Sequence, residues 1–342
     1  MTRPSADAGA SDAEIIQLIQ AFIGAQTGET PPEIVRLHRA SLGKSRENWS
    51  LDAVWGGDAS GPEPLIVRRD PEGGLVDTDR ELEFNLLRAL EPSGLPVPKV
   101  RWLDATGEWL GRPSLVMRRL AGESDYFVVN NDHLPLATRV SLAERFCDLL
   151  AAVHLVPWAQ LGLGEILPDP GPGAAEAELA RFEQVLRTDE LRRYDEIEAI
   201  LAWLRDHAPR SEPTVLVHAD FKPGNVLLAD GEITALLDWE LAHLGDRHED
   251  LGWVTQPLRE REHLIAGAWE RDQLLQRYAD ATGFDVDEDA LHWWQTFATF
   301  RTLVMQVSGL RAYVEDRSDK AYRPTQKVLS TGMRQITKGS AA

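Results

Sequence analysis

The segment VHADFKPGNVLL, residues 217–228, places a dense polar loop between two short apolar runs. The runs TVLV and NVLL on either side have the length and apolar character of buried strands. An Asp-Gly pair at 230–231 then predicts a tight turn, and the run ITALL after it leads to Asp238. Because a hairpin returns the chain to the end where it began, Asp220, Asn225 and Asp238 are expected to converge.

These three side chains suit chemistry on a phosphate. An Asn amide oxygen and an Asp carboxylate, completed by phosphate oxygens and water, form a ligand set that Mg²⁺ prefers, which makes Asn225 and Asp238 candidate metal ligands. Asp220 is then left to accept the proton of a hydroxyl group. Since phosphoryl transfer depends mainly on positioning and charge neutralisation, the loop predicts a site for that reaction.

Composition limits the partners. The 342 residues carry a net charge of -19 without a long cluster of Lys and Arg, so nucleic acid is not expected as a partner. No run approaches the ~18 apolar residues of a membrane span, so no membrane contact is expected. The N-terminus lacks an apolar signal core. Because Cys147 is the single cysteine, no disulfide can form within the chain, and a cytoplasmic protein is expected.

Local patterns divide the chain into two lobes, residues 1–120 and 121–342. In the smaller lobe, Ser11 and Glu14 form a capping box that predicts a first helix. A second short helix is expected to begin near Pro32. Strand patterns follow from SLGKSRENWSLDAVW to PLIVRRD, and again in KVRWLDA and SLVMRRL. One helix, DTDRELEFNLLRAL, separates these two groups of strands.

The larger lobe is mainly helical. Its first long amphipathic helix, ATRVSLAERFCDLLAAVHLV, contains His154, which is expected to be structural. Further helical patterns cover about 175–208 and about 257–314, and the strand-rich segment with the polar loop lies between them. Trp293 and Trp294 are expected to pack in the core.

Two other motifs are not assigned to binding. The GKS at 43–45 is not a phosphate-binding P-loop, because that motif requires a Gly five positions before Gly43 and position 38 is His. The segment HLGDRHED, residues 243–250, has two histidines and three acids that could ligate a metal. We favour solvated loop polarity as its interpretation.

The stretch LVHADFKPGNVLL, followed by ITALLDWELAHLGDRHEDLGWV, resembles the core pattern of the aminoglycoside phosphotransferase and choline kinase family. Upstream, VRRDPEGGLVDTDRELEFNLLRAL, PVPKV and PSLVMRRLAGES are similar to a subgroup, the kinase-like domains attached to some acyl-CoA dehydrogenases. The resemblance implies an α+β, bilobal, protein-kinase-like fold, with a small mixed β-sheet N-lobe and a larger, mainly helical C-lobe. It also implies ATP and Mg²⁺ as cofactors.

The resemblance implies a role for each polar residue of the loop. Asp220 would be the catalytic base, and Asn225 and Asp238 would hold Mg²⁺. His218 would brace the loop through hydrogen bonds. Lys222 would either contact the γ-phosphate or face the solvent, and both interpretations remain open.

In the N-lobe, the resemblance places Arg68 where the family has its phosphate-contacting cation, with Glu83 as its partner. Independently of the family, Glu83 lies on the apolar stripe of its predicted helix, and a carboxylate there usually needs a cation. An exposed position at the edge of the stripe is the alternative. Met117 would lie near the adenine base, and backbone groups around Arg119 would form hydrogen bonds with the edge of this base.

Two departures from the pattern affect the expected function. The nucleotide loop SLGKSRENW contains only Gly43 as a glycine, so weaker binding of phosphates by its backbone N–H groups is expected. Only eleven residues lie between Asp238 and Asp250, the family's support of the catalytic loop, which leaves no room for a long activation segment. A small-molecule acceptor is therefore expected rather than a protein.

The predicted function is transfer of the γ-phosphate of ATP to a hydroxyl of a small molecule. An aminoglycoside-like, choline-like or hydroxyacyl acceptor remains possible, and the sequence makes no prediction of oligomeric state. The net charge of -19 favours a cationic acceptor, whereas the subgroup resemblance favours a hydroxyacyl thioester. The alternative, motivated by the glycine-poor loop, is a catalytically weak nucleotide-binding or scaffold protein.

Overall fold

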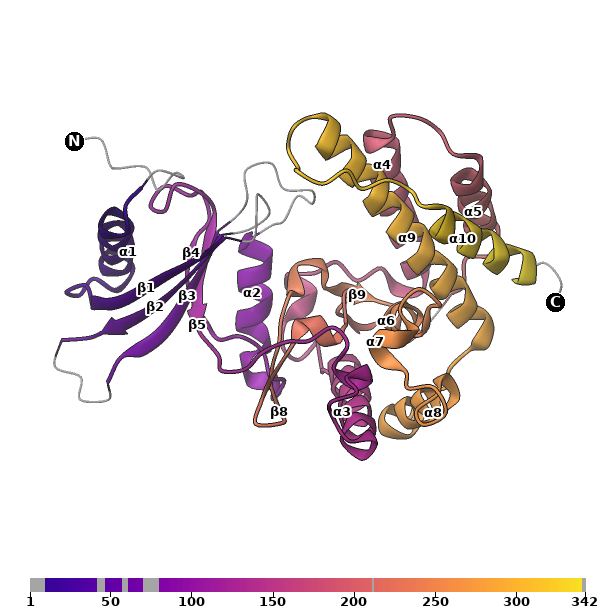
Figure 1. The fold of residues 1–342 in the computed structure, drawn as a ribbon, viewed down its shortest axis with the longest axis horizontal. Coiled ribbons are helices and arrows are strands. Elements are labelled where there is room, and N and C mark those ends of the chain that lie inside the picture. The colour runs from indigo at the N-terminus through magenta and orange to yellow at the C-terminus, as the bar shows by residue number, and fades with distance from the viewer. Residues whose placement is uncertain (1–9, 42–46, 57–60, 70–79, 211, 340–342) are drawn as a thin grey trace.

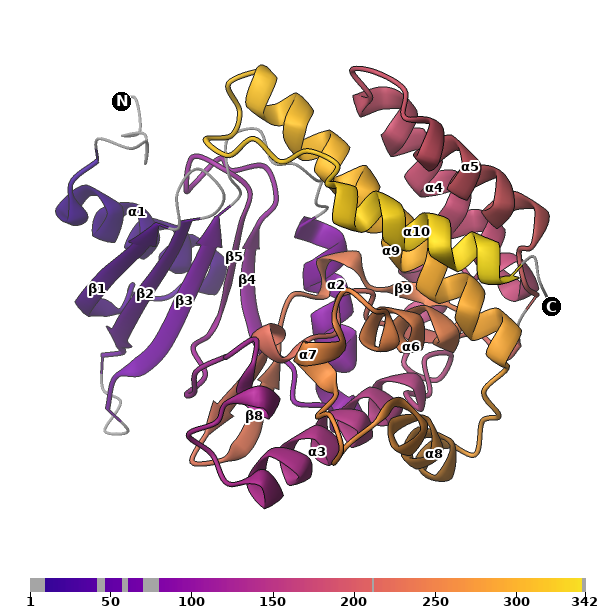
Figure 2. The same cartoon turned by 45° about the vertical axis from the view of Figure 1, so that its right-hand side comes forward.

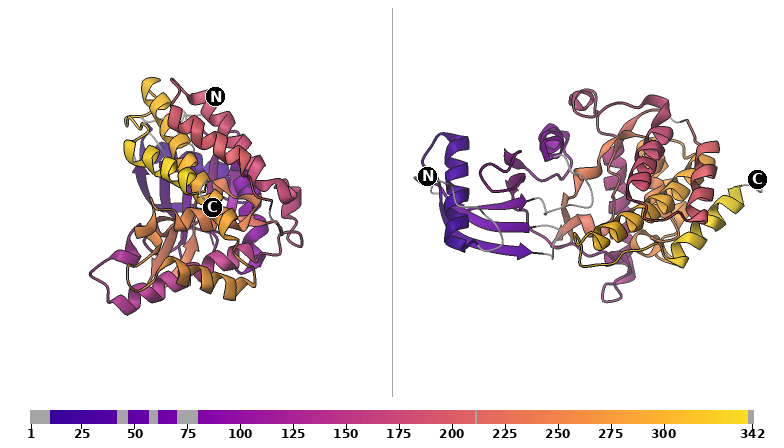
Figure 3. Two further views of the ribbon diagram at one scale, coloured as in Figure 1. Left: turned by 90° about the vertical axis from the view of Figure 1, so that its right-hand side faces the viewer. Right: turned by 90° about the horizontal axis from the view of Figure 1, so that it is seen from above.

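The computed structural model describes residues 10–41, 47–56, 61–69, 80–210 and 212–339 (Figure 1). The α-helices of these ranges are α1 (Asp12–Thr27), α2 (Arg80–Leu90), α3 (Leu136–His154), α4 (Ala174–Asp189), α5 (Asp195–Asp206), α6 (Arg247–Thr255), α7 (Glu260–His263), α8 (Arg271–Thr282), α9 (Glu288–Val314) and α10 (Gln326–Gly339). The strands are β1 (Glu33–Ser41), β2 (Glu47–Val54), β3 (Glu63–Arg69), β4 (Val100–Asp104), β5 (Ser114–Arg118), β6 (Val215–Val217), β7 (Val226–Ala229), β8 (Glu232–Leu236) and β9 (His243–Gly245). The expected α+β, bilobal fold is confirmed, with the sheet and most of the helices at opposite ends of the molecule (Figure 3). Gly43 of the nucleotide loop lies outside the described residues.

The N-lobe is a five-stranded antiparallel sheet in the order β1-β2-β3-β5-β4. Successive side chains of a strand point to opposite faces of the sheet. Val116 therefore packs in the cluster under α1, whereas its neighbours Leu115 and Met117 belong to the cluster shared with α2 and the C-lobe. Val67 also packs under α1, so Arg68, the next residue of β3, reaches toward the C-lobe.

The first helix is confirmed and the second is not. The hydroxyl of Ser11 accepts the N–H of Glu14, and the Glu14 carboxylate accepts the N–H of Ser11, as the capping box predicts. The expected helix near Pro32 is wrong, because the chain forms β1 there. Ile34 is buried and Val35 is exposed, which is the alternation of a half-buried strand, and β2 supplies the antiparallel ladder. Pairing along the whole strand outweighs the local helix signal of the prolines.

α2 lies between the sheet and the C-lobe (Figure 1). Its residues Leu87 and Leu90 share one buried cluster with Leu236 and Trp239 of the C-lobe. A backbone hydrogen bond from Leu236 N–H to the carbonyl of Pro96, 2.7 Å long, joins the segment after α2 to β8. The two lobes therefore share a core and are not joined by a linker alone.

The C-lobe contains the predicted hairpin. β7 and β8 are antiparallel, and the turn residues Asp230 and Gly231 have φ values of 51° and 80°. Two positive φ values are those of the type I′ turn that the Asp-Gly pair predicted. α4 and α5 lie beside α9 and α10 (Figure 2), where Trp293 and Trp294 are buried as expected. Among the described helices, none has the length and apolar character that a membrane crossing requires.

The connection between the lobes is anchored to this hairpin. Glu123 N–H donates to the carbonyl of Leu228 at 3.0 Å, and Leu228 N–H donates back at 2.9 Å. Gly122 has a φ of +124°, and a Cβ there would lie 2.9 Å from the Leu228 carbonyl oxygen, so both backbone conformation and space favour glycine. The chain that leaves the sheet is thus fixed on β7 before α3 begins. The lobe boundary at residue 120 stays a prediction.

Candidate active site

His218 is buried and holds the polar loop in shape. Its Nε2 lies 3.0 Å from the carbonyl oxygen of Leu237 and must donate to it. Its Nδ1 lies 3.2 Å from the N–H of Asp220 and must accept from it. These two contacts fix a neutral imidazole with the proton on Nε2. Burial lowers the pKa of the His218 imidazole and so favours the same neutral form.

Asp250 supports the loop from α6. Its carboxylate accepts the backbone N–H groups of His218 at 2.7 Å and of Ala219 at 2.9 Å. The Nε2 of His154, 3.2 Å away, donates to the same carboxylate, while His154 Nδ1 contacts the Tyr278 hydroxyl. Burial raises the pKa of Asp250, but the hydrogen bonds from His154 and His218 outweigh it and hold this pKa below its usual value. The expected structural role of His154 therefore agrees with its contacts.

Asp220 is oriented by two neighbours in the loop. Asn225 Nδ2 donates to the Asp220 backbone carbonyl at 2.9 Å and to Oδ2 at 3.0 Å. Lys222 Nζ lies 2.5 Å from the same Oδ2. Asp220 Oδ1 accepts no hydrogen bond from the described residues, and the side chain is 19% exposed. Lys222 is only 14% exposed, so it does not face the solvent freely.

The residues of the loop fit a magnesium ion. Both partners of the Asn225 amide are acceptors, so the nitrogen must face them and Oδ1 must point away. The N–H of Leu237 donates to the backbone carbonyl of Asn225 at 2.7 Å, which places Asp238 next to Asn225. Asp238 has a left-handed backbone, with φ at 62°, and its carboxylate is 30% exposed. The amide oxygen of Asn225 and the carboxylate of Asp238, whose Oδ1 also pairs with Arg68, are the hard oxygen atoms that would ligate the ion.

Arg68 joins the lobes at this point. Its guanidinium contacts Glu83 at 3.1 Å, Asp238 at 2.7 Å and Glu240 at 3.4 Å. Burial lowers the pKa of Arg68, but the three carboxylates outweigh it and raise this pKa further above the physiological range. The structure thus brings Arg68 and Glu83 together, and both are buried. Arg80 contacts the other oxygen of Glu83.

The adenine-side residues lie on β5 and just after it. Met117 is 7% exposed and belongs to the cluster shared with α2. The N–H of Arg119 donates to the carbonyl of Pro64 at 3.0 Å, and its guanidinium contacts Ser50 and Asp52 at 2.6 Å. These contacts tie the segment after β5 to β2 and to the start of β3. The nucleotide-binding roles of Met117 and Arg119, like those of Arg68 and Glu83, stay predictions.

The expectation of a solvated loop at residues 243–250 is wrong. The segment forms β9 and the first turn of α6, its charged groups have partners, and all of them except the half-buried His243 are buried. His243 contacts Glu249 at 3.0 Å, and His248 contacts Asp246 at 2.7 Å. Asp246 is the N-cap of α6 and Glu249 follows at the third helical position. This spacing resembles a capping box and was the available signal for a helix start.

Sequence reasoning missed two arginines of the site. Arg80 precedes Glu83 by three positions, the spacing of neighbours on one helix face, so its contact had a local signal. Arg301 of α9 donates to the carbonyl of Ala219, directly before Asp220. The 82 positions between Arg301 and Ala219 leave no local pattern that predicts this contact.

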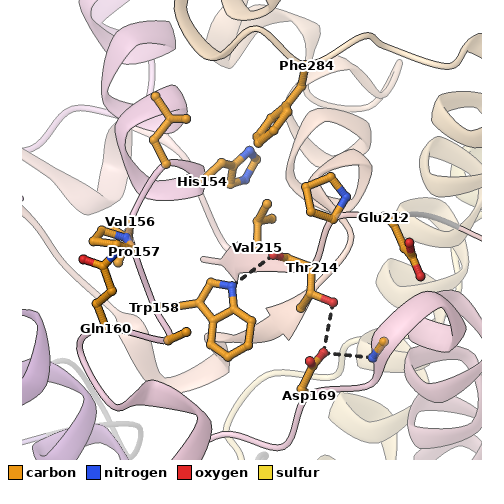
Figure 4. Close-up of a pocket in the computed structure, with 14 residues that line it drawn as sticks. His154, Val156, Pro157, Trp158, Gln160, Asp169, Glu212, Thr214, Val215 and Phe284 are labelled. Carbon is orange, nitrogen blue, oxygen red and sulfur yellow. Dashed lines mark hydrogen bonds between the residues drawn. The ribbon is translucent and has the colours of Figure 1, made fainter.

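A pocket of about 800 Å³ lies at the other end of β6 from the polar loop (Figure 4). Trp158 Nε1 donates to the carbonyl of Thr214 at 3.0 Å, and the Thr214 hydroxyl donates to Asp169 at 2.9 Å. None of the predicted site residues lines this pocket, although His154, which supports Asp250, does. It is therefore separate from the candidate active site.

A family model described as the phosphotransferase enzyme family matches residues 44–294. Among curated proteins, the chain is similar to acyl-CoA dehydrogenase family member 10 of Mus musculus, with 27% identity over 202 residues, 55% of this chain and 18% of that protein. It is also similar to acyl-CoA dehydrogenase family member 11 of Gallus gallus, with 24% identity over 242 residues, 67% of this chain and 29% of that protein. The chain spans less than a third of the length of these relatives.

Solved phosphotransferase structures share the fold. A Ralstonia eutropha protein assigned to the aminoglycoside phosphotransferases has a TM-score of 0.75 and 19% identity, covering 94% of this chain and 98% of that one. A thermostable mutant of aminoglycoside phosphotransferase APH(4)-Ia, in a ternary complex with AMP-PNP and hygromycin B, has a TM-score of 0.59 and 17% identity, covering 95% and 99%. A macrolide 2'-phosphotransferase from Brachybacterium faecium has a TM-score of 0.60 and 17% identity, covering 95% and 98%. At these identities the likeness extends to the fold alone.

Proposed function

The chain belongs to the phosphotransferase enzyme family, and from this premise we propose that it transfers the γ-phosphoryl group of ATP to a hydroxyl of a small molecule. The proposal rests on the hydrogen bonds of the Asp220 carboxylate. Its Oδ2 is held by Lys222 and Asn225, while Oδ1 has no partner among the described residues. A carboxylate fixed in this way can receive the hydroxyl proton of an acceptor.

Each residue around Asp220 would have its own role in the transfer. Mg²⁺ held by Asn225 Oδ1 and Asp238 would neutralise charge on the phosphate oxygens. Lys222 lies beside the base and would contact the γ-phosphoryl group. His218 keeps the loop in shape and takes no part in proton transfer, because both of its nitrogens are engaged.

The N-lobe residues would bind the nucleotide. Glu83 orients the planar guanidinium of Arg68 through Nη1, and Nη2, which pairs with Asp238 and Glu240, would contact a phosphate oxygen. Met117 and the backbone around Arg119 would contact the base. The lobe boundary at residue 120 belongs to this proposal, because it separates nucleotide-binding from acceptor-binding residues. The proposal also includes a cytoplasmic location, where the protein would have access to ATP.

The acceptor is proposed to be a small molecule. The chain between Asp238 and α6 consists of a short 3-10 helix and β9, so it offers no long segment on which a protein substrate would dock. A cationic alcohol, aminoglycoside-like or choline-like, suits the net charge of -19. A hydroxyacyl thioester suits the similarity to the acyl-CoA dehydrogenase family members. A screen with both chemical classes distinguishes them.

The test combines binding with turnover. A ligand that binds only the folded protein raises its melting temperature. We expect ATP to raise the melting temperature in a Mg²⁺-dependent way in the wild type, and the Mg²⁺ dependence to be lost in Asp238→Ala. ADP formation with an accepted hydroxyl compound should be lost in Asp220→Asn. Asp272→Ala, at a 92% exposed carboxylate, is the matched control and should behave as the wild type.

The scaffold alternative predicts a different result. Binding of ATP without any ADP formation across both acceptor classes would favour a nucleotide-binding protein without transfer. Absence of any shift at millimolar ATP would contradict nucleotide binding altogether. The arrangement of Asp220, Asn225 and Asp238 favours transfer, because a scaffold has no need of a base next to two magnesium ligands.

A further inference from the structure

His243 occupies an ion-paired position next to the catalytic loop. It begins β9 and pairs with Val217, the residue directly before that loop. Its Nδ1 lies 2.9 Å from the carbonyl oxygen of Leu241. Its Nε2 lies 3.0 Å from Oε2 of Glu249 and 3.9 Å from Oε1 of Glu178. Both ring nitrogens therefore face oxygen atoms, and the Leu241 carbonyl can only accept.

The charges around this ring decide where the proton lies. A neutral imidazole would require Glu249 to carry the proton. Burial raises the pKa of Glu249, whereas His243, and Arg301 Nη1 at 3.3 Å from the other oxygen of Glu249, favour the ionised carboxylate. Burial raises the pKa of Glu178, but His243 and then Arg181 outweigh it and lower this pKa, so Glu178 favours the imidazolium. Burial lowers the pKa of His243, but Glu178 and Glu249 outweigh it and raise this pKa to about 9. In the part of the chain that the structure describes, the charges that act on the ring are those of Glu178 on α4 and Glu249 on α6, which pair with Arg181 on α4 and Arg301 on α9.

The same three residues resemble a metal site. Ligand atoms of Glu178, His243 and Glu249 all lie within 4.8 Å of one another. A metal requires a lone pair from the imidazole, however, and both nitrogens of an imidazolium carry protons. Each carboxylate already has an arginine partner as well. The arrangement therefore fits a protonated imidazole ring that faces two carboxylates better than it fits a metal ion.

The network continues into the catalytic loop. Arg301, which contacts Glu249 through Nη1, donates through Nη2 to the carbonyl of Ala219. Ala219 has a φ of 65°, a left-handed conformation that is unfavourable for a residue with a Cβ. Its N–H is held by Asp250 on the other side. The residue before Asp220 thus keeps its strained backbone because both of its polar groups are held.

We infer that His243 is a positioning residue: its cation fixes Glu249, and Glu249 fixes Arg301 against the Ala219 carbonyl that sets the backbone of Asp220. Through Glu178 it also connects the loop to α4. Ordering of the loop by this network does not depend on what the loop does. Its effect on phosphoryl transfer rests on the proposed function.

The protonation of His243 is measured directly by ¹⁵N NMR of the histidine rings, with the signal assigned by its loss in His243→Gln. We expect an imidazolium at pH 7 that loses its proton near pH 9. Glu178→Gln removes one facing carboxylate without touching the loop, and the titration should move to lower pH. A His243 ring that titrates at or below the ordinary value of about 6.5 would overturn the inference.

Order in the loop is measured by amide hydrogen exchange. We expect the protection of the Ala219 amide to fall at least tenfold in His243→Gln at pH 7.5. His292→Gln is the matched control, because His292 contacts the carbonyl of Gln335 and the ring of Trp203 and none of the residues of the His243 network, and protection should not change. In the wild type, protection should fall as the pH rises through about 9, and in Glu178→Gln it should fall at a lower pH.

These outcomes separate the two proposals. Unchanged protection of Ala219 in His243→Gln would overturn the positioning role even if the wild type is an active kinase. Loss of protection in that variant would support the role even if no acceptor is phosphorylated, and only the proposed function would then fail. If the wild type is active, kcat should fall about tenfold in His243→Gln, with the KM for ATP unchanged within twofold.

Discussion

Arg68 Nη2 lies 2.7 Å from Asp238 Oδ1, which joins a strand of the N-lobe to the end of the C-lobe hairpin across 170 positions of sequence. The same guanidinium contacts Glu83, which has a second cation, Arg80, on its other oxygen. A buried carboxylate and a buried guanidinium therefore compensate each other where the lobes meet.

We predict that Arg68→Met weakens ATP binding about 10- to 100-fold and lowers the free energy of unfolding by about 3 kcal/mol, because removing one partner of a buried ion pair leaves the other charge uncompensated. Arg68→Lys should give intermediate ATP affinity, since one ammonium cannot replace the planar fork. Calorimetry with ATP and Mg²⁺ and urea unfolding measure the two effects. Arg101→Met, in an exposed pair with Glu63, is the control and should change both quantities little. Wild-type ATP affinity in Arg68→Met would contradict the role of Arg68.

A second prediction concerns the base. Asp220→Asn keeps the volume of the side chain but removes the acceptor of the hydroxyl proton. We expect kcat to fall about 10²- to 10⁴-fold, the usual contribution of a positioned general base, with ATP affinity within threefold of the wild type. Steady-state ADP formation and ATP titration measure these quantities. Asp132→Asn, at a 94% exposed carboxylate, should leave both unchanged. Retained turnover in Asp220→Asn would remove Asp220 from this role.

The positions of the polar loop, residues 217–228, and of its hairpin could be predicted because their signals are local. The Asp-Gly pair at 230–231 specifies a turn type by its backbone requirements alone. Once that turn is fixed, the position of Asp238 beside Asn225 follows from strand pairing. The apolar stripe around Glu83 likewise predicted a cation partner, and the contact with Arg68 fits that argument.

Other features depend on contacts that no local pattern encodes. β1 forms because it pairs with β2 in the sheet and packs against α1, although Pro32 and its neighbours carry a helix signal. Residues 243–250 are polar enough to suggest a solvated loop, yet partners on α4 and α9 allow their burial. The hydrogen bond between Arg301 and Ala219 joins segments that lie 82 positions apart in the sequence.

A third prediction is a pH dependence of stability. His263 is buried, its Nε2 has no partner among the described residues, and its ring stacks on Phe221 of the polar loop with centroids 6.3 Å apart. Burial, and then the charge of Arg259, lower the pKa of His263 to about 3. Below pH ~6.5 the unfolded chain binds a proton at this position and the folded chain does not. Stability should therefore fall between pH 6.5 and 3, by up to about 1.4 kcal/mol per pH unit.

His263→Phe tests this prediction, because it keeps an aromatic ring against Phe221 without a titrating group. Urea unfolding at pH 7.5, 6 and 5 should show a smaller loss of stability toward acid in His263→Phe than in the wild type. His133→Phe, at an exposed histidine, is the control and should keep the wild-type slope. Equal slopes in His263→Phe and the wild type would show that His263 takes up its proton in the folded protein near its ordinary pKa.

The fourth prediction concerns the contact of α6 with α9, which positions Asp250. A Cβ at Gly252 would lie 2.7 Å from the backbone carbon of Trp294, so the two helices would have to separate. Helix propensity alone would make Gly252→Ala stabilising by about 1 kcal/mol. We expect a net loss of about 1–3 kcal/mol instead, because overpacking against a backbone cannot be relieved by a side-chain rotation. Gly173→Ala is the control, since its Cβ would meet nothing nearer than a carboxylate oxygen at 3.8 Å. Urea unfolding measures both variants, and a Gly252→Ala protein as stable as the wild type would mean that α6 can move away from α9 without cost.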